Sequence, residues 1–90
     1  MREVVRSTAF KKDVKRAAKR GKDMAKLKAM ILLLIEDAKL EPRYRDHPLK
    51  GEWLGYRDLH VEPDWVLPYR ATETELRLAR TGTHSELFGE

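Results

Sequence analysis

The chain has 90 residues, a net charge of +4 and no cysteine, and 41% of its residues are hydrophobic. At this length we expect one domain, residues 1–90, because two separate cores would each be too small to be stable. The lack of cysteine excludes disulfides and zinc–thiolate sites. The longest apolar run, residues 30–35, is too short to span a bilayer, and the first residues lack the apolar stretch of a signal peptide. We therefore expect a cytoplasmic protein with no membrane partner.

The positive charge is unevenly divided along the chain. Residues 1–45 hold fourteen Lys and Arg against six Asp and Glu, a net +8, whereas residues 46–90 hold five against nine, a net −4. A concentration of basic residues of this kind indicates either a solvated helix face or a surface that binds a polyanion, and the sequence does not favour one interpretation over the other. Most of the excess comes from Lys11, Lys12, Lys15, Arg16, Lys19, Arg20, Lys22, Lys26 and Lys28.

A strand and a helix are predicted at the start of the chain. Residues 3–6, with two adjacent valines, predict a short strand. Apolar residues then recur at i, i+4, i+7 and i+8 from Phe10, which is the spacing of one helix face. Ser7 or Thr8 offers a hydroxyl N-cap, and Gly21 lies where a C-cap belongs.

A second helix is predicted directly after the first. Asp23 can cap it, and apolar residues recur at helical spacing from Met24 to Ile35. Because only residues 21–22 join them, the two helices are expected to form an antiparallel hairpin whose apolar faces cover a sheet. Residues 39–50, which include two prolines, are the only stretch that resembles a linker.

From residue 52 the pattern changes to strands separated by tight turns. Aromatic and branched residues predict three strands, and two tight turns in succession predict an antiparallel meander. The predicted strands are residues 53–61, 65–70 and 75–81. Pro68 lies within the second of them, although proline lacks the N–H that a ladder uses. Either that position faces outward at a bulge, or the strand prediction is wrong there.

The tail, residues 83–89, is predicted to form one helical turn, because Thr83 and Glu86 stand at the spacing of a capping box. The order of elements is therefore β-α-α-β-β-β with a short C-terminal helical turn. We expect an α+β fold in which the helix hairpin packs on one face of a small, mainly antiparallel sheet.

Three histidines are placed in loops or near strand ends, where active sites tend to assemble on a rigid scaffold. They are His47, His60 and His84. Alternation along the strand puts His60 on the face opposite Leu59 and Val61, which is the open face if those two contact the helices. Asp64, in the turn that follows, adds a carboxylate. A single histidine is more often structural, so it is their shared placement that points to function.

These residue types fit RNA cleavage better than two rival chemistries. No pair of histidines has a metal-ligand spacing, and neither Ser7 nor Ser85 lies in a nucleophile elbow. Cleavage of RNA needs a base for the 2′-hydroxyl proton, an acid for the 5′-oxygen and a cation for the phosphorane, with no metal required. Arg80, close to His84, is a candidate cation. Its alternative role is a surface ion pair. Arg80 alternates along the predicted strand with Leu76 and Leu78, so the sequence leaves open whether its side chain points outward.

The aromatic side chains are expected to lie mainly in the core, but one or two could stack on unpaired bases. Phe88 is the best candidate for stacking because its segment follows His84 directly. Packing of the terminal turn onto the sheet is an equally open role for it. The other aromatic residues considered are Trp53, Tyr56, Trp65 and Tyr69.

Five segments together resemble the YafQ branch of the RelE toxin superfamily. They are residues 22–27, 46–53, 55–58, 60–65 and 80–88. The similarity runs in register from about residue 10 to the C-terminus, with no large gap. The combination of the last two segments is highly specific to this family, whereas the lysine-rich helices alone would be a weak signal.

The resemblance implies a RelE-like fold and a toxin of a type II toxin–antitoxin system. It implies an endoribonuclease that needs no cofactor and cuts translated mRNA in the ribosomal A site. The expected partners are a cognate antitoxin, the 70S ribosome and mRNA. The chain departs from the family at Pro68, where such toxins usually carry an aliphatic residue.

The resemblance also assigns roles to individual residues. The matching catalytic cluster is His47, His60, Asp64 and His84, with His84 as the principal acid or base and its partner left open. The matching substrate contacts are Arg80 for the phosphate and the aromatics Trp65 and Phe88 beside it. The residues expected to contact ribosomal RNA are Lys11, Lys12, Lys15 and Lys19.

Two other functions stay open at this point. A ParE-like toxin would share the fold and inhibit DNA gyrase by binding, without chemistry of its own. Such a toxin does not need three histidines, so their presence argues against it. A plain RNA-binding module, in which the histidines are structural, would bind mRNA and leave it uncut.

Overall fold

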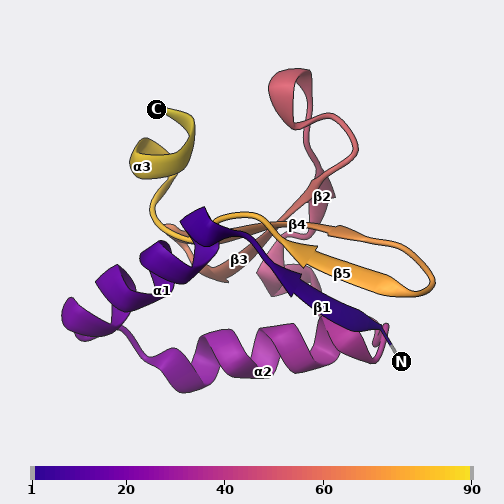
Figure 1. Ribbon diagram of the computed structural model, residues 1–90, viewed down its shortest axis with the longest axis horizontal. Coiled ribbons are helices and arrows are strands. Elements are labelled where there is room, and N and C mark those ends of the chain that lie inside the picture. The colour runs from indigo at the N-terminus through magenta and orange to yellow at the C-terminus, as the bar shows by residue number, and fades with distance from the viewer. Residues whose placement is uncertain (1, 90) are drawn as a thin grey trace.

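The computed structural model, which describes residues 2–89, has two helices on one face of a five-stranded sheet and a short C-terminal helix on the other side (Figure 1). The helices are α1 (Thr8–Lys19), α2 (Met24–Ile35) and α3 (His84–Phe88). The strands are β1 (Glu3–Arg6), β2 (His47–Pro48), β3 (Arg57–Glu62), β4 (Trp65–Ala71) and β5 (Glu75–Leu78). Two 3₁₀ turns are η1 (Pro42–Tyr44) and η2 (Gly51–Trp53). None of the helices in residues 2–89 is both long and apolar enough to cross a membrane.

The strands lie in the order β1-β5-β4-β3-β2. The strands β3, β4 and β5 form the predicted antiparallel meander, and β2 pairs antiparallel with β3. Strand β1 instead pairs in parallel with β5, with Glu3 opposite Glu75, so the N-terminal strand lies beside the last strand. The predicted α+β architecture with a mainly antiparallel sheet is confirmed.

Both long helices begin at caps that the sequence predicts. Ser7 caps α1, since its hydroxyl accepts the Phe10 N–H at 2.9 Å. Asp23 caps α2, since its carboxylate accepts the Ala25 N–H at 3.1 Å. Gly21 turns the chain between the helices with a φ of +79°, a left-handed conformation that glycine adopts without a steric clash.

The hydrophobic core lies between the helix pair and the sheet. Its buried members are Phe10, Ala17, Leu27, Met30, Leu34, Leu59, Val61, Trp65, Leu67, Tyr69, Leu76 and Leu78. Each fully buried leucine contributes about 2 kcal/mol, so this packing dominates the stability of the fold. Because side chains alternate along a strand, the remaining positions of β3 and β4 face the opposite side of the sheet.

Two predictions for the middle of the chain are wrong. Residues 53–61 do not form one strand, because β3 begins only at Arg57. Trp53 and Tyr56 pack edge-to-face in the preceding loop, with ring centroids 5.6 Å apart, so their aromatic character reflects a contact within the loop. Residues 39–50 are not a plain linker, since they include η1 and β2. A strand of two residues is too short to show a period in the sequence.

The last strand is shorter than predicted, and this explains how Pro68 is tolerated. Strand β5 ends at Leu78, and Gly82 then rejoins β4 through an isolated bridge. The carbonyl of Pro68 accepts the Ala79 N–H at 3.1 Å. In an antiparallel strand the N–H and C=O of one residue point to the same neighbour, so the missing N–H faces the irregular stretch after β5. The strand prediction is therefore correct at Pro68, and the proline interrupts no regular ladder.

Candidate active site

The three histidines meet on the face of the sheet opposite the helix pair. His60 lies on β3 between Leu59 and Val61, which belong to the core, so its predicted orientation is confirmed. The ring centroid of His60 is 5.8 Å from that of His47 and 5.2 Å from that of His84. Imidazoles from segments far apart in the sequence thus form one cluster.

Polar contacts in the loop before β2 fix the position of His47. Asp46 accepts a hydrogen bond from the Tyr69 hydroxyl at 2.6 Å and pairs with Arg57 at 3.1 Å. The Nδ1–H of His47 donates to the backbone carbonyl of Arg45 at 2.7 Å. Because a carbonyl oxygen only accepts, Nδ1 carries the hydrogen of the neutral ring, and Nε2 keeps its lone pair.

His84 is the first residue of α3 and is held by Asp64. The Oδ1 atom of Asp64 accepts the backbone N–H of His84 at 3.1 Å and lies 2.8 Å from Nδ1 of the ring. These hydrogen bonds from His84 lower the pKa of Asp64, so its charged carboxylate orients the imidazole. Thr83 and Glu86 cap the helix with the capping box that the sequence predicts.

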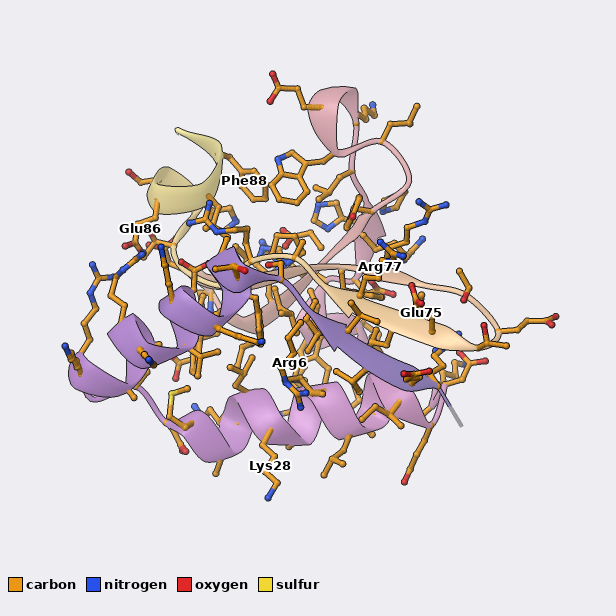
Figure 2. All side chains as sticks on the ribbon, in the orientation of Figure 1. Arg6, Lys28, Glu75, Arg77, Glu86 and Phe88 are labelled. Carbon is orange, nitrogen blue, oxygen red and sulfur yellow. The ribbon has the colours of Figure 1, made fainter. Side chains whose placement is uncertain are left out.

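Phe88 lies one turn further along α3, at the rim of the histidine cluster. Its ring centroid is 6.4 Å from that of His84 and 5.8 Å from that of Trp53, the latter in an edge-to-face contact. Glu86 extends to the other side of the helix (Figure 2), where it pairs with Arg20 of α1 at 2.9 Å. Helix α3 is therefore attached to α1 on one side and presents an aromatic ring to the histidines on the other.

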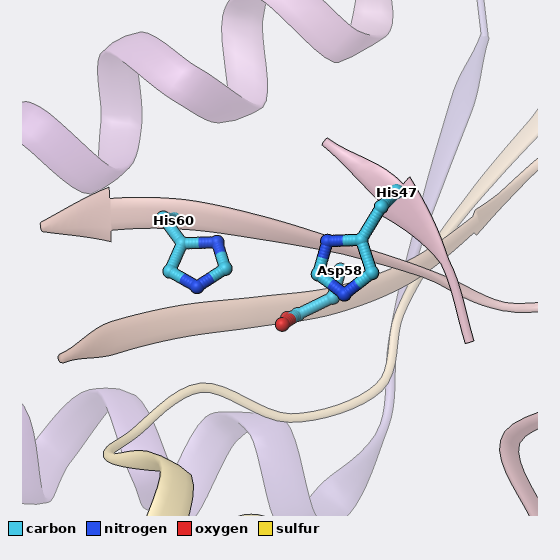
Figure 3. Close-up of side chains that lie close together, drawn as sticks. All are labelled: His47, Asp58 and His60. Carbon is cyan, nitrogen blue, oxygen red and sulfur yellow. The ribbon is translucent and has the colours of Figure 1, made fainter. Parts of the chain in front are cut away.

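Asp58 is a residue of this cluster that sequence analysis missed. It lies opposite His47 across β2 and β3, is 2% exposed, and stands close to His47 and His60 (Figure 3). Burial raises the pKa of Asp58 to about 6, against the opposing effect of the charges on His47 and His84. The signal was present in the sequence, because the alternation that places His60 on the open face also places Asp58 there.

His60 and Asp58 each leave a buried polar atom unused. Within residues 2–89, neither Nδ1 of His60 nor Oδ1 of Asp58 has a hydrogen-bond partner. Burial, followed by the charges of the other two histidines, lowers the pKa of His60. One donor atom each from His47, Asp58 and His60 lies within 4.8 Å of the others, so these three residues could hold a metal ion.

The cluster opens into a cleft of about 490 Å³ that two cations, Arg45 and Lys50, also line. A second cleft of about 650 Å³ adjoins it, since both are lined by Arg45 and His60, and Lys26 and Arg43 border this second cleft. Positive charge along neighbouring clefts favours a polyanionic ligand such as a nucleic-acid strand.

Arg80 and Trp65 do not reach the cleft. The Nε–H of Arg80 donates to Asp13 of α1 at 2.6 Å, so the Arg80 side chain lies on the helix side of the sheet. This direction follows from the strand alternation, which places Arg80 on the same face as the core residues Leu76 and Leu78. Trp65 is 1% exposed, and its Nε1–H donates to the Thr81 hydroxyl at 2.9 Å, so its ring has no surface for a stacked base. The predicted residues that the structure brings together are His47, His60, Asp64, His84 and Phe88.

Known proteins share both this sequence and this fold. A family model for the bacterial YafQ toxin of type II toxin–antitoxin systems matches residues 2–89. The mRNA interferase toxin YafQ of Escherichia coli strain K12 is 55% identical over 89 residues, which are 98% of this chain and 97% of that protein.

Solved structures agree with the sequence comparison. The toxin in the Escherichia coli DinJ–YafQ toxin–antitoxin complex matches with a TM-score of 0.91 and 55% identity, covering 98% of each chain. A metal-bound toxin from Helicobacter pylori matches with a TM-score of 0.91 and 40% identity, covering 98% of this chain and 100% of that one. The chain therefore belongs to the YafQ family of toxins of bacterial type II toxin–antitoxin systems.

Proposed function

We propose that this toxin is an mRNA interferase that cuts translated mRNA in the ribosomal A site by acid–base catalysis. The observation that carries the proposal is a cleft in which three imidazoles meet beside two carboxylates. These are His47, His60 and His84 with Asp58 and Asp64. The similar Escherichia coli protein is named an mRNA interferase. Imidazoles transfer protons near neutral pH, so the reaction needs no metal ion.

In the proposed reaction the phosphorus atom of the RNA backbone exchanges its bond to the 5′-oxygen for a bond to the neighbouring 2′-oxygen. A base takes the proton of the 2′-hydroxyl, and the 2′-oxygen then forms a bond to phosphorus. The bond from phosphorus to the 5′-oxygen breaks, and an acid protonates that oxygen. The products are a 2′,3′-cyclic phosphate on one fragment and a 5′-hydroxyl on the other.

His60 and His84 are the pair that we assign to the two proton transfers. Their ring centroids are 5.2 Å apart. Because burial lowers the pKa of His60, its ring is neutral at pH 7 and can accept the 2′-hydroxyl proton. His84, oriented by Asp64, supplies the proton to the 5′-oxygen. His47, whose ring centroid is 5.8 Å from that of His60, is assigned to contact the 2′-hydroxyl.

Arg45 and Lys50 are the cations that we assign to the scissile phosphate, because they line the cleft. Phe88, at the rim beside His84, is assigned to stack on an unpaired base. Arg80 and Trp65 are assigned a positioning role. The hydrogen bond from Arg80 to Asp13 and the hydrogen bond from Trp65 to Thr81 both hold the segment that leads to His84.

Helix α1 provides the surface that we assign to ribosomal RNA. The exposed lysines of this helix are Lys11, Lys12, Lys15 and Lys19. Within residues 2–89 none of them forms an ion pair, whereas Arg16 and Arg20 on the same helix are paired with acidic residues. The lysine charges are therefore available to a phosphate backbone.

Changing Lys11, Lys15 and Lys19 together to glutamate is expected to weaken binding to 70S ribosomes by about tenfold or more, because phosphate contacts are lost and repulsion is added. Co-sedimentation with ribosomes at several salt concentrations measures this. The matched control reverses Lys28 and Lys39, which are exposed elsewhere, and should change little. Unchanged ribosome binding by the triple variant would reject the assignment.

A cognate antitoxin is the other partner that we infer. The Escherichia coli relative forms a complex with the antitoxin DinJ, and its toxin chain matches this one over nearly its full length. We infer that this toxin is likewise bound by an antitoxin and acts in the cytoplasm, where mRNA is translated.

Mapping of mRNA ends after induction of the toxin tests the proposed function. Primer extension should show new 5′ ends, and those ends should carry hydroxyl groups that require phosphorylation before ligation. A gyrase inhibitor or a plain RNA-binding module would leave no new ends, and a supercoiling assay with purified gyrase identifies the former. Cleavage by a metal-activated water would give fragments without a cyclic phosphate intermediate.

A further inference from the structure

A second cleft, of about 650 Å³, adjoins the cleft that holds the histidine cluster. Its walls come from α2, η1 and the end of β3, with Ala29 and Met30 on the helix, Tyr44 on η1 and Val61 on the strand. The volume lies within the range of about 300 to 1,000 Å³ in which proteins hold one small ligand. The second cleft is therefore large enough for one nucleotide.

Tyr44 gives the second cleft a flat aromatic wall. The ring is half-buried, and the guanidinium of Arg43 lies 4.8 Å from its centroid and donates to its hydroxyl at 2.8 Å. The buried side chains of Met30 and Val61 add apolar surface beside it. Unpaired bases of RNA stack on aromatic rings and on guanidinium planes in this way. The wall therefore has the chemistry that holds a base.

Arg45 supplies a positive charge where the two clefts meet. It ends η1 in a left-handed conformation, with a φ of +47° that non-glycine residues rarely adopt, and it lines both clefts. Within residues 2–89 its side chain forms no ion pair, whereas its neighbour Arg43 is paired with Glu41 at 3.0 Å. The carboxylate of Glu62 also lines the second cleft, but Lys26 pairs with it at 3.0 Å and balances its charge. The charge of Arg45 is therefore available to a phosphate group.

The shared lining of the two clefts gives a direction to the RNA. His60 lines both, whereas His84 and Phe88 line the first cleft and, among the described residues, not the second. This step rests on the proposed function, in which His60 acts on the 2′-hydroxyl of the nucleotide before the broken bond and His84 protonates the 5′-oxygen of the nucleotide after it. We propose that the second cleft binds the nucleoside on the 5′ side of the broken bond, with its base on Tyr44 and its 3′-phosphate at Arg45.

This arrangement separates the two bases that flank the broken bond. Phe88, assigned to stack on a base beside His84, then takes the base on the 3′ side. The reaction requires the 2′-oxygen, the phosphorus and the 5′-oxygen to lie nearly in line. Bases held in two different clefts do not stack on each other, so the backbone between them is free to adopt that alignment.

Adenosine 3′-monophosphate, titrated into the isotope-labelled toxin and followed by NMR, tests the subsite without any cleavage. The amide signals of Ala29 and Val61 should shift, because both residues line the second cleft. Tyr44→Ala should weaken binding by about tenfold, the usual loss for one stacked base, and Tyr44→Phe, which keeps the ring, should restore it. Shifts confined to Lys50 and His84 in the first cleft, or equal binding by Tyr44→Ala, would overturn the subsite.

The direction of the RNA is tested by the position of the phosphate on the probe. Adenosine 5′-monophosphate carries the same base, but its phosphate is on the other side of the sugar, so it should bind several-fold more weakly than the 3′-monophosphate. Equal binding of the two nucleotides would overturn the proposed direction.

Ala29→Trp is a second variant, which should fold even if Tyr44→Ala does not, because Ala29 is exposed and the indole enters the second cleft. On a defined mRNA with ribosomes it should lower kcat/KM by about tenfold and leave the pH dependence of the rate unchanged. Ala25→Trp is the matched control: it makes the same change one turn earlier on α2, at an exposed residue whose side chain leans away from Ala29, and it should cleave like the wild type.

The cleavage assay separates a failure of the subsite from a failure of the proposed function. Cleavage by Ala29→Trp at the wild-type rate would overturn the subsite and leave the nuclease assignment intact. A wild-type toxin that produces no new 5′ ends would overturn the proposed function instead, and the nucleotide titration would still decide whether the second cleft binds a nucleoside 3′-phosphate.

Discussion

Replacing His84 with alanine is expected to lower the rate of mRNA cleavage by about 10² to 10⁴, the usual contribution of a general acid or base. Growth arrest on induction should be lost with it. The fold should persist, because the side chain of His84 is partly exposed and its backbone N–H bond to Asp64 remains. The caps of α3, Thr83 and Glu86, are not altered either.

Primer extension on a defined mRNA with purified ribosomes measures the effect of His84→Ala. Ser85→Ala is the matched control, since it truncates the next residue of the same helix, which is exposed and lies outside the cluster. Antitoxin binding, measured on both variants, should equal that of the wild type. Full cleavage by His84→Ala would show that the imidazole takes no part in the reaction.

Replacing Asp13 with alanine is expected to lower the free energy of unfolding by about 3 kcal/mol, a large share of the stability of a small domain. The Asp13 side chain is 1% exposed and accepts from Arg80 at 2.6 Å, from the Thr81 backbone N–H at 3.1 Å and pairs with Arg16 at 3.3 Å. Its loss leaves the buried N–H of Thr81 without a partner and weakens the attachment of α1 to the segment after β5.

Urea denaturation of the Asp13 variants measures this loss. Asp13→Asn should be less damaging, since the amide oxygen can still accept the Thr81 N–H. Glu41→Ala is the matched control, because it breaks an ion pair whose members are 65% and 69% exposed, and should change stability by less than about 1 kcal/mol. Equal effects of Asp13→Ala and Glu41→Ala would contradict a structural role for the buried carboxylate.

The helices could be predicted from the sequence because their signals are local. Ser7, Asp23 and Gly21 each act on residues within one turn, so no knowledge of the tertiary fold was needed. The start of β3 and the existence of β2 could not be predicted in the same way. Strand pairing depends on partners distant in the sequence, and the aromatic residues before Arg57 gave a strand-like composition to a loop.

The sequence predicted which residues belong to the candidate site better than it predicted which way their side chains point. The family motifs placed His47, His60, Asp64 and His84 together, and the structure shows those side chains in one cluster. A motif does not say which way a side chain points. For Arg80, alternation with the core residues Leu76 and Leu78 predicts the observed direction of the side chain toward α1, whereas the family motif predicts a contact with the substrate phosphate.

The parallel pairing of β1 with β5 has a consequence for the order of folding. The helix hairpin and the β3–β4–β5 meander involve near neighbours in the chain and can form quickly, whereas bringing Glu3 opposite Glu75 closes a loop of about seventy residues. We therefore expect that step to come late. Helix α1 follows β1 directly, and its contacts with Arg80 and Glu86 hold the segment around His84. A partly folded chain can thus contain both helices and the meander while its last histidine still lacks a fixed position.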